Sequence, residues 1–478
     1  MTPRLHSLTA IAAVSALAGC NLAPAYVRPP SAIPAALPQG DSYPAAATDA
    51  PDITRIGWRE FFIDERLRRV IQAGLDNNRD LQIAAGNVLQ ARAQYRVQRA
   101  DLAPNVAASG SATYTNSPTA GATSTAGAAA APGGTGDSPF YSATVGLTAF
   151  ELDLFGRVRN LNRAALERYF ASEEAQRSVR ISLIAEIATA WLTLAADQDQ
   201  LALSQRTLQT FEDTLRLTTA QFRIGVASEL ESRQAETNYQ AARNDIAVLR
   251  TRIAQDRNAL DLLVGAPVGP ADLPSRLGDG RVTAEALPTN LSSNVLLRRP
   301  DILQAEHQLI AENANIGAAR AAFFPTISLT AALGTISTAL TGLFAGGSFG
   351  YTAGPSVGLP LFDGGRARGN LAYAQASRQI AVAQYQKAVQ TAFREAADAL
   401  AQRGTIGEQI AAQTARAEAA QAAAGLSEAR YRAGVESFLI SLDAQRTAYA
   451  AQQQLVATRY ARGGNLIELY RALGGGLT

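Results

Sequence analysis

Few residues of this chain could carry out chemistry. The two histidines are His6 and His307, the only lysine is Lys387, and the only cysteine is Cys20. His307 and Lys387 lie in stretches that read as helix, where a packed or exposed structural role is the simplest one. The segment Gly364-Gly365-Arg366 is too short for a phosphate-binding loop. Because no triad, metal cluster or nucleotide loop can be assembled, the sequence predicts no enzyme, no cofactor and no metal site.

The N-terminus predicts the compartment. A basic start precedes an apolar stretch (8–17) that ends in Leu-Ala-Gly-Cys at 17–20. This pattern is typical of a secretory signal and is too short for a spanning helix. The residues Leu-Ala-Gly-Cys at 17–20 resemble the cleavage box of bacterial lipoproteins. This resemblance implies that 1–19 are removed and that Cys20 carries lipid, palmitate included. By the same resemblance, Asn21 favours sorting to the outer membrane. The alternative to a lipoprotein signal is an ordinary signal peptide.

The overall charge argues against a nucleic-acid partner. The chain carries 43 basic and 41 acidic residues, a formal net charge of +2 over 478 residues. Proteins that bind nucleic acid usually carry a basic excess on one face. Outside the signal, no stretch approaches 18 consecutive apolar residues, so the sequence predicts no transmembrane helix. A membrane-inserted portion would have to be β-structure.

The chain contains an internal repeat. The sequence at 78–104 is echoed at 299–325, and the sequence at 222–235 is echoed at 431–444, in the same order. Such a duplication suggests two similar halves that lie side by side around an axis rather than two unrelated domains.

Long helices are expected in each half. Residues 157–224 and 226–264 contain neither proline nor glycine, and no proline follows Pro360. A run as long as 157–224 would reach roughly 100 Å as a helix. Apolar residues recur every seven positions, which predicts left-handed supercoiling: Ile187, Leu194, Leu201, Leu208, Leu215 and Phe222. Periodicity alone leaves a solid coiled-coil rod and a water-filled helical tube as alternatives.

Four segments of about ten residues alternate between apolar and polar positions, as membrane strands do. They lie near 106–114, 141–149, 326–333 and 352–361, although Pro355 weakens the last assignment. The interpretation is one hairpin in each half, with soluble hairpins as the alternative. Four strands cannot close a barrel, for which about eight are the practical minimum. Three copies of the chain would supply an even twelve.

Several motifs resemble one family. They are the lipoprotein box with NLAPAYVRP (21–29), RRPDI (298–302), IGAARAAFFP (316–325), LFDGGRARG (361–369) and YRAGVESFLISLDAQR (431–446). Together they resemble the TolC-like outer-membrane factor lipoproteins of tripartite RND-type drug-efflux pumps, over essentially the whole mature chain. The resemblance implies a mainly α homotrimer with a 12-stranded outer-membrane β-barrel continued by a 12-helix periplasmic α-barrel. It also implies a periplasmic adaptor, an inner-membrane transporter and a role in antibiotic resistance.

The implied domains follow from that architecture. They are a signal peptide (1–19), a lipidated segment that joins an equatorial belt (20–64), a first repeat (65–264) with hairpin 105–154 and tip 223–229, a linker (265–297), a second repeat (298–462) with hairpin 326–362 and tip 432–438, and a C-terminal belt segment (463–478).

The two tips are the candidate functional site. Glycine permits a sharp reversal, and a following serine can cap the next helix. The resemblance implies that the tips dock the adaptor, through Gly225, Val226, Ser228, Gly434, Val435 and Ser437. It also implies that Leu439 and Asp443, four residues apart on one helix face, form the gate.

Three copies of Asp443 would make an anionic constriction. Leu230 and Gln234 are the equivalent positions of the first repeat, so an acidic ring would be threefold. The alternative for Asp443 is a solvated acid near a helix start. The sequence thus predicts an efflux duct, with a type I protein-secretion duct and a structural coiled-coil lipoprotein as alternatives.

Overall fold

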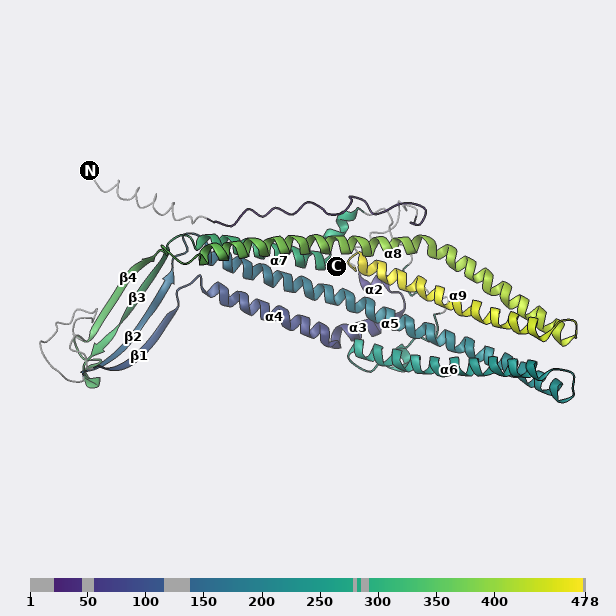
Figure 1. Cartoon of the computed structure of the whole chain (residues 1–478). Coiled ribbons are helices and arrows are strands. Elements are labelled where there is room, and N and C mark those ends of the chain that lie inside the picture. Colours follow the sequence, from purple (N-terminus) through teal and green to yellow (C-terminus); the bar gives the residue numbers. More distant parts are fainter. Residues whose placement is uncertain (1–20, 45–55, 116–137, 278–281, 285–291, 476–478) are drawn as a thin grey trace. The chain divides into compact units, whose positions relative to one another are not determined.

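The computed structural model describes residues 21–44, 56–115, 138–277, 282–284 and 292–475. The signal peptide (1–19), Cys20 and most of the first predicted hairpin loop (116–137) lie outside these residues. The described chain is mainly helical and carries one sheet (Figure 1). The helices are α2 (Trp58–Phe61), α3 (Glu65–Asn77), α4 (Arg79–Ala100), α5 (Arg157–Arg223), α6 (Glu229–Val264), α7 (Pro300–Ala321), α8 (Arg366–Arg432) and α9 (Phe438–Ala472). Short 3₁₀ turns are η2 (Pro270–Asp272), η3 (Ser293–Arg298) and η4 (Leu340–Gly342).

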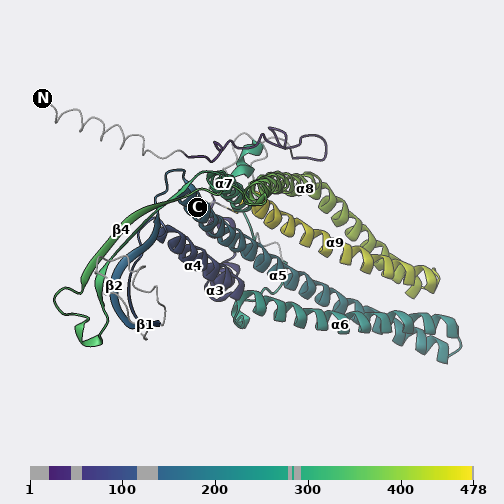
Figure 2. The same ribbon diagram turned by 60° about the vertical axis from the view of Figure 1, so that its left-hand side comes forward.

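The chain divides into two compact units. The first comprises 1–29, 88–172 and 305–385, and it contains the sheet. The second comprises 30–87, 173–304 and 386–478, and it contains the helical tips. In both views α6 lies beside the second half of α5, and α9 lies beside the second half of α8 (Figures 1 and 2).

The sheet of the first unit has the order β1-β2-β3-β4, and every neighbouring pair is antiparallel. The strands are β1 (Val106–Thr115), β2 (Ser138–Glu151), β3 (Thr326–Ser337) and β4 (Phe349–Gly358). The register shifts between Leu147 and Phe150, where Ala149 has φ +50°, so a bulge interrupts β2. Glycine is required beside this site because a Cβ on Gly146 would lie 2.4 Å from the Ala331 carbonyl oxygen.

The register separates the two faces of the sheet. Val145, Leu333 and Tyr351 are paired across neighbouring strands on one face. The other face carries hydroxyl pairs that bridge the strands: Ser109 with Thr144 at 2.9 Å, Ser111 with Ser142 at 2.8 Å, and Ser328 with Ser356 at 2.7 Å. The period-two pattern therefore sorts apolar from hydroxyl side chains in three dimensions.

The last strand differs from the sequence expectation at its end. β4 includes Pro355 but stops at Gly358, so Leu359 and Leu361 lie beyond it. Proline is tolerated because β4 is an edge strand and one side of its backbone has no ladder to complete.

The core of the second unit gathers around aromatic rings. Phe61 stacks on Tyr470 with ring centroids 4.2 Å apart, and Phe62 meets Phe61 edge-on. The indole of Trp191 is buried and donates to the carbonyl oxygen of Asp272 at 3.0 Å. The first contacts join α2 to the end of α9, and the last joins η2 to the long helix α5.

Helix α9 continues past the expected start of a separate C-terminal segment at 463. It crosses Gly463 and Gly464 and ends at Ala472. A Cβ on Gly463 would lie only 3.0 Å from Leu192 Cδ1, so glycine serves close packing against α5 here rather than a helix end. The sequence predicted no transmembrane helix, but among the described helices α5 is long and apolar enough to cross a membrane by length and composition. Of its most apolar stretch 56% is buried in the protein, as in a core helix.

Candidate gate at the helical tips

The turn between α5 and α6 is a glycine-capped helix end. Gly225 has φ +79°, in the left-handed region that side chains with a Cβ adopt at a cost. Its N–H donates to the carbonyl oxygen of Phe222, and the N–H of Val226 donates to that of Gln221 at 2.9 Å. This pair of bonds is the Schellman motif, which satisfies the last carbonyl groups of α5.

The turn between α8 and α9 repeats this geometry. Gly434 has φ +74°, and its N–H donates to the carbonyl oxygen of Tyr431 at 2.9 Å. The N–H of Val435 donates to that of Arg430 at 3.0 Å. The repeated sequence therefore builds the same reversal twice, and at each tip the glycine supplies the required backbone conformation.

The two serines after these turns behave differently. Ser228 forms a capping box with Glu231: the Glu231 N–H donates to Ser228 Oγ, and the Ser228 N–H donates to the Glu231 carboxylate, both at 3.3 Å. Ser437 stands at the N-cap of α9, but its side chain accepts no capping bond. The residue three positions on is Ile440, which has no carboxylate to return the bond.

A small apolar cluster joins the tips. Phe438 is 2% exposed and packs with Leu442 and Ala235, while Leu215 and Tyr431 cover the cluster. These residues come from α5, α6, α8 and α9. The cluster therefore ties the first helical pair to the second.

Tyr431 was not singled out from the sequence. Its hydroxyl donates to Gln221 Oε1 at 2.7 Å, and burial raises the pKa of the phenol above its ordinary value. The first repeat has Phe222 at the equivalent position, and that ring is exposed. The Phe-to-Tyr difference between the repeats was the available signal, although the distant partner Gln221 could not be identified from it.

Glu436 is a second residue that sequence reasoning missed. Its Oε2 lies 3.3 Å from Arg430 Nε and accepts a hydrogen bond from Ser427 at 3.0 Å. The ion pair crosses the turn and stabilises the geometry set by Gly434.

The predicted gate residues share an open face. Leu439 is 61% exposed and Asp443 is exposed one turn later, whereas Phe438 between the turn and Leu439 points into the cluster. Asp443 has no hydrogen bond or ion pair with any residue in the described part of the chain. In the first repeat Leu230 is 66% exposed, but Gln234 is half-buried. In the described part of the chain, Leu439 and Asp443 therefore both face solvent near the tip.

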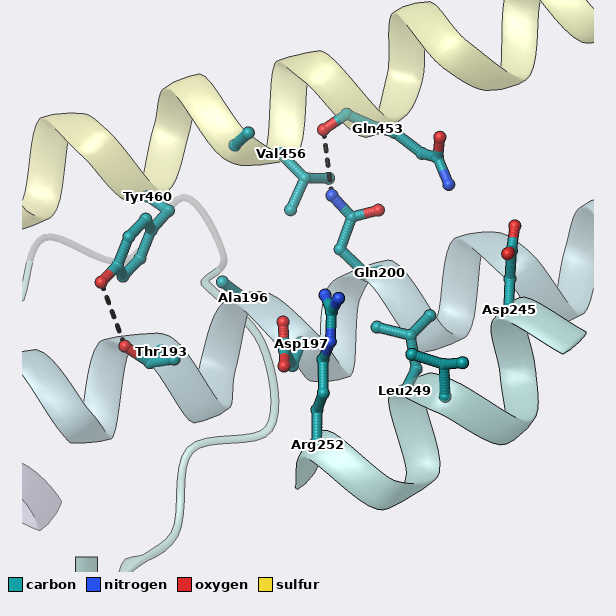
Figure 3. Close-up of a pocket in the computed structure, with 12 residues that line it drawn as sticks. Thr193, Ala196, Asp197, Gln200, Asp245, Leu249, Arg252, Gln453, Val456 and Tyr460 are labelled. Carbon is teal, nitrogen blue, oxygen red and sulfur yellow. Dashed lines mark hydrogen bonds between the residues drawn. The ribbon is translucent and has the colours of Figure 1, made fainter. Parts of the chain in front are cut away.

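Residues of α5, α6 and α9 line an open pocket of about 360 Å³ with both apolar and polar side chains (Figure 3). Gln200 Nε2 donates to the Gln453 carbonyl oxygen at 2.9 Å, and the Thr193 and Tyr460 hydroxyls lie 3.1 Å apart. Figure 3 shows Asp197 of α5 beside Arg252 of α6. The Gln200–Gln453 and Thr193–Tyr460 contacts hold α9 against α5.

Two carboxyl groups, Asp197 of α5 and Asp256 of α6, influence each other near this pocket. Burial raises the pKa of Asp197, and burial together with the charge of Asp197 raises the pKa of Asp256. The charge of Arg252 lowers the pKa of both groups and so opposes these rises. Among the residues that the structure describes, no three histidine, cysteine or acidic side chains are grouped as metal ligands would be.

Comparison with known proteins identifies the class to which this fold belongs. The open state of the Neisseria gonorrhoeae MtrE outer membrane channel superposes with a TM-score of 0.83 at 36% identity, covering 96% of this chain and 99% of that one. The toluene efflux pump outer membrane protein TtgC of Pseudomonas putida is 45% identical over 478 residues, 100% of this chain and 96% of the relative. The cation efflux system protein CusC of Escherichia coli is 38% identical over 462 residues, 96% and 97% of the two chains.

The fold is thus that of the TolC-like outer-membrane efflux channels. The sequence profile of the outer membrane efflux protein family matches residues 70–266 and 291–475, and the chain belongs to that family. The resemblance noted from the sequence motifs is confirmed.

Proposed function

We propose that the protein is the outer-membrane duct of a tripartite efflux pump and conducts small toxic compounds from the periplasm to the outside. The observation that carries the proposal is the four-stranded sheet with two unpaired edges. Among the residues that the structure describes, β1 and β4 are both ten residues long and each pairs on one side only. Unpaired edges of this length invite pairing with another chain. Three copies that pair β4 of one subunit with β1 of the next form a 12-stranded barrel.

The two faces of the sheet support its place in the outer membrane. The apolar face, with Val145, Leu333 and Tyr351, suits lipid, and the hydroxyl face suits a wet interior. The long helices then continue the barrel as a periplasmic tunnel of twelve helices. Residues 20–64, 265–297 and 463–478 contribute to a belt around it, and lipid on Cys20 adds a second anchor.

The gate of this duct lies at the helical tips. Three Asp443 side chains form an anionic ring, and three Leu439 side chains form an apolar constriction beside it. Leu230 and Gln234 of the first repeat complete the lining. The exposure of Leu439 and Asp443 in the described structure supports this assignment.

The tips also dock the periplasmic adaptor. Val226 and Val435 are both exposed at the turns, next to the rigid glycine caps. Exposed apolar residues on a rigid turn are suited to bind a partner with little ordering cost. The inner-membrane transporter supplies the energy for transport.

The test is the state of the full-length protein extracted from outer membranes in mild detergent. The expected result is a trimer by light scattering that migrates as a trimer in dodecyl sulfate and dissociates on boiling. Reconstituted into planar bilayers, the same trimer should form discrete channels. A monomer in detergent, or a trimer that never conducts, would contradict the duct and favour a structural lipoprotein.

A further inference from the structure

A second open pocket, of about 590 Å³, lies within the second unit. Val456 of α9 lines both this pocket and the one shown in Figure 3, so the two are neighbours along α9. The pocket of Figure 3 includes residues of α6, whereas this one includes Gln421 of α8 and Arg276 from the segment that follows η2. Most of its lining side chains are polar. It is called the arginine pocket below.

Three guanidinium groups line the arginine pocket, from Arg206 of α5, Arg459 of α9 and Arg276. The only carboxylate among its lining residues is Asp199 of α5. Burial raises the pKa of Asp199, and the charges of all three arginines oppose that rise. The three cations therefore lie near the same carboxylate, and together they outweigh its charge.

Asp199 is already bound to the wall of the pocket. Its Oδ2 accepts a hydrogen bond from the Leu277 N–H at 3.1 Å, and its Oδ1 lies 3.9 Å from Arg276 Nε. These contacts hold Arg276 and Leu277 against α5. In the part of the chain that the structure describes, no hydrogen bond or ion pair engages the guanidinium group of Arg206 or of Arg459. Both groups therefore have N–H donors to offer to a ligand.

Uncharged donors complete the lining. The side-chain amide of Gln452 of α9 donates to Oε1 of Gln421 of α8, which leaves the N–H groups of Gln421 for another acceptor. Thr207 of α5 adds a hydroxyl group. Guanidinium groups bind the oxygens of phosphates and carboxylates through short charge-assisted hydrogen bonds, and amide and hydroxyl donors can bind the same oxygens.

We propose that the arginine pocket binds a small polyanion, a molecule that carries more than one phosphate or carboxylate group. Arg206 and Arg459 make the charge-assisted contacts, and Asp199 holds Arg276 in place beside them. A volume of about 590 Å³ is in the range of pockets that bind small molecules. Because Arg206 and Arg459 belong to α5 and α9, the bound anion links these two helices. This site is additional to the duct and does not depend on conduction.

The experiment is isothermal titration calorimetry of the full-length protein in mild detergent, at constant ionic strength. Inorganic pyrophosphate and citrate are the probes, and tighter binding of one identifies phosphate or carboxylate as the preferred group. We expect saturable binding of at least one probe. A Kd weaker than about 1 mM for both would overturn the proposal. Binding of a polyglutamate peptide without binding of either small anion would also overturn it, in favour of an acidic protein partner.

Substitutions test whether the binding occurs in this pocket. Arg206→Gln and Arg459→Gln should each weaken binding about tenfold, because each removes charge-assisted hydrogen bonds. Arg206→Lys keeps the charge but loses the planar fork, so it should weaken binding less than Arg206→Gln. Arg250→Gln is the matched control, since Arg250 is exposed on α6 outside the pocket and the change in net charge is the same.

All three substituted arginines are exposed, so the melting temperatures without ligand should agree with that of wild type. Saturating probe should raise the melting temperature of wild type and of Arg250→Gln more than that of Arg206→Gln or Arg459→Gln. Equal affinities in Arg206→Gln and Arg250→Gln would overturn the proposal, because the probe would then respond to the overall charge of the protein and not to the arginine pocket.

Discussion

Tyr431 at the end of α8 donates its hydroxyl hydrogen to Gln221 Oε1 at the end of α5, at 2.7 Å. The two residues stand at the last turns of helices from different repeats, so the bond connects the two tips directly. The same tyrosine ring covers the apolar cluster around Phe438. The positions of the exposed residues Leu439 and Asp443 therefore depend on the Tyr431–Gln221 bond and on the packing of the cluster around Phe438.

The first prediction concerns this bond. Tyr431→Phe keeps the ring and removes the hydroxyl, which should cost about 1 kcal/mol of tip stability. Because the bond links the helical pairs, channels of the variant in planar bilayers should open more often than those of wild type. Tyr373→Phe is the control, since Tyr373 is exposed on α8. Opening frequencies that are equal in all three proteins would show that the bond does not restrain the gate.

The second prediction concerns the glycine cap. Gly434→Ala forces a Cβ into the left-handed region and should destabilise the tip by about 1–2 kcal/mol. No steric clash contributes, because nothing lies within 4 Å of the added Cβ. Gly425→Ala, within α8 and equally open, should instead be neutral or stabilising by up to about 1 kcal/mol. Protease cleavage at the tip should be faster in the first variant only, and similar rates in both would refute the strained-turn account.

The third prediction uses the two serines as a matched pair. Ser228→Ala removes a capping box and should cost about 1 kcal/mol of helix stability. Ser437→Ala removes no capping bond and should cost markedly less. Hydrogen exchange at the first turns of α6 and α9 measures both effects. Equal acceleration at the two positions would mean that Ser437 caps α9 in solution.

Much of this fold follows from local sequence patterns. The runs without proline and glycine correspond to α5 and α6, the absence of proline after Pro360 corresponds to α8 and α9, and period-two alternation corresponds to the four strands, because these patterns report local structure. The tip glycines follow for the same reason, since a reversal between two long helices needs a left-handed residue. The absence of a capping box at Ser437 could have been predicted from Ile440, which has no carboxylate to complete one.

Other features depend on distant partners and could not be predicted. The sequence predicted a separate C-terminal segment from residue 463, but α9 continues through Gly463, which packs closely against Leu192. Residues 21–28 have no periodicity, and their contacts with Glu306 and Asn313 join segments far apart in the sequence. The Tyr431–Gln221 bond likewise joins the two repeats. In each case local sequence patterns do not indicate which two distant residues come into contact.

The fourth prediction concerns pH. The raised pKa values of Asp197 and Asp256 mean that the folded protein binds these protons more tightly than the unfolded chain. Their stabilising contribution is therefore complete below the ordinary carboxyl pKa and is lost as pH rises through the raised values. Asp256→Asn removes one charge of the pair, so it should raise the melting temperature at about pH 7.5.

At about pH 4, near the unperturbed carboxyl pKa, the same substitution should have little effect. Glu212→Gln on the exposed side of α5 is the control and should change neither value. A lower melting temperature for Asp256→Asn at the higher pH would contradict the account, because it would mean that the charged pair is stabilising there.

The central claim is that the protein is a duct closed at its tips by Leu439 and Asp443. The most direct measurement is the single-channel conductance of reconstituted trimers in planar bilayers, for wild type and for Leu439→Ala/Asp443→Ala. The account predicts small, rare openings for wild type and a clearly larger conductance for the double variant. A wild-type channel that is already wide open and unchanged by the substitutions would contradict this gate, and correctly inserted trimers that do not conduct in either form would contradict the duct itself.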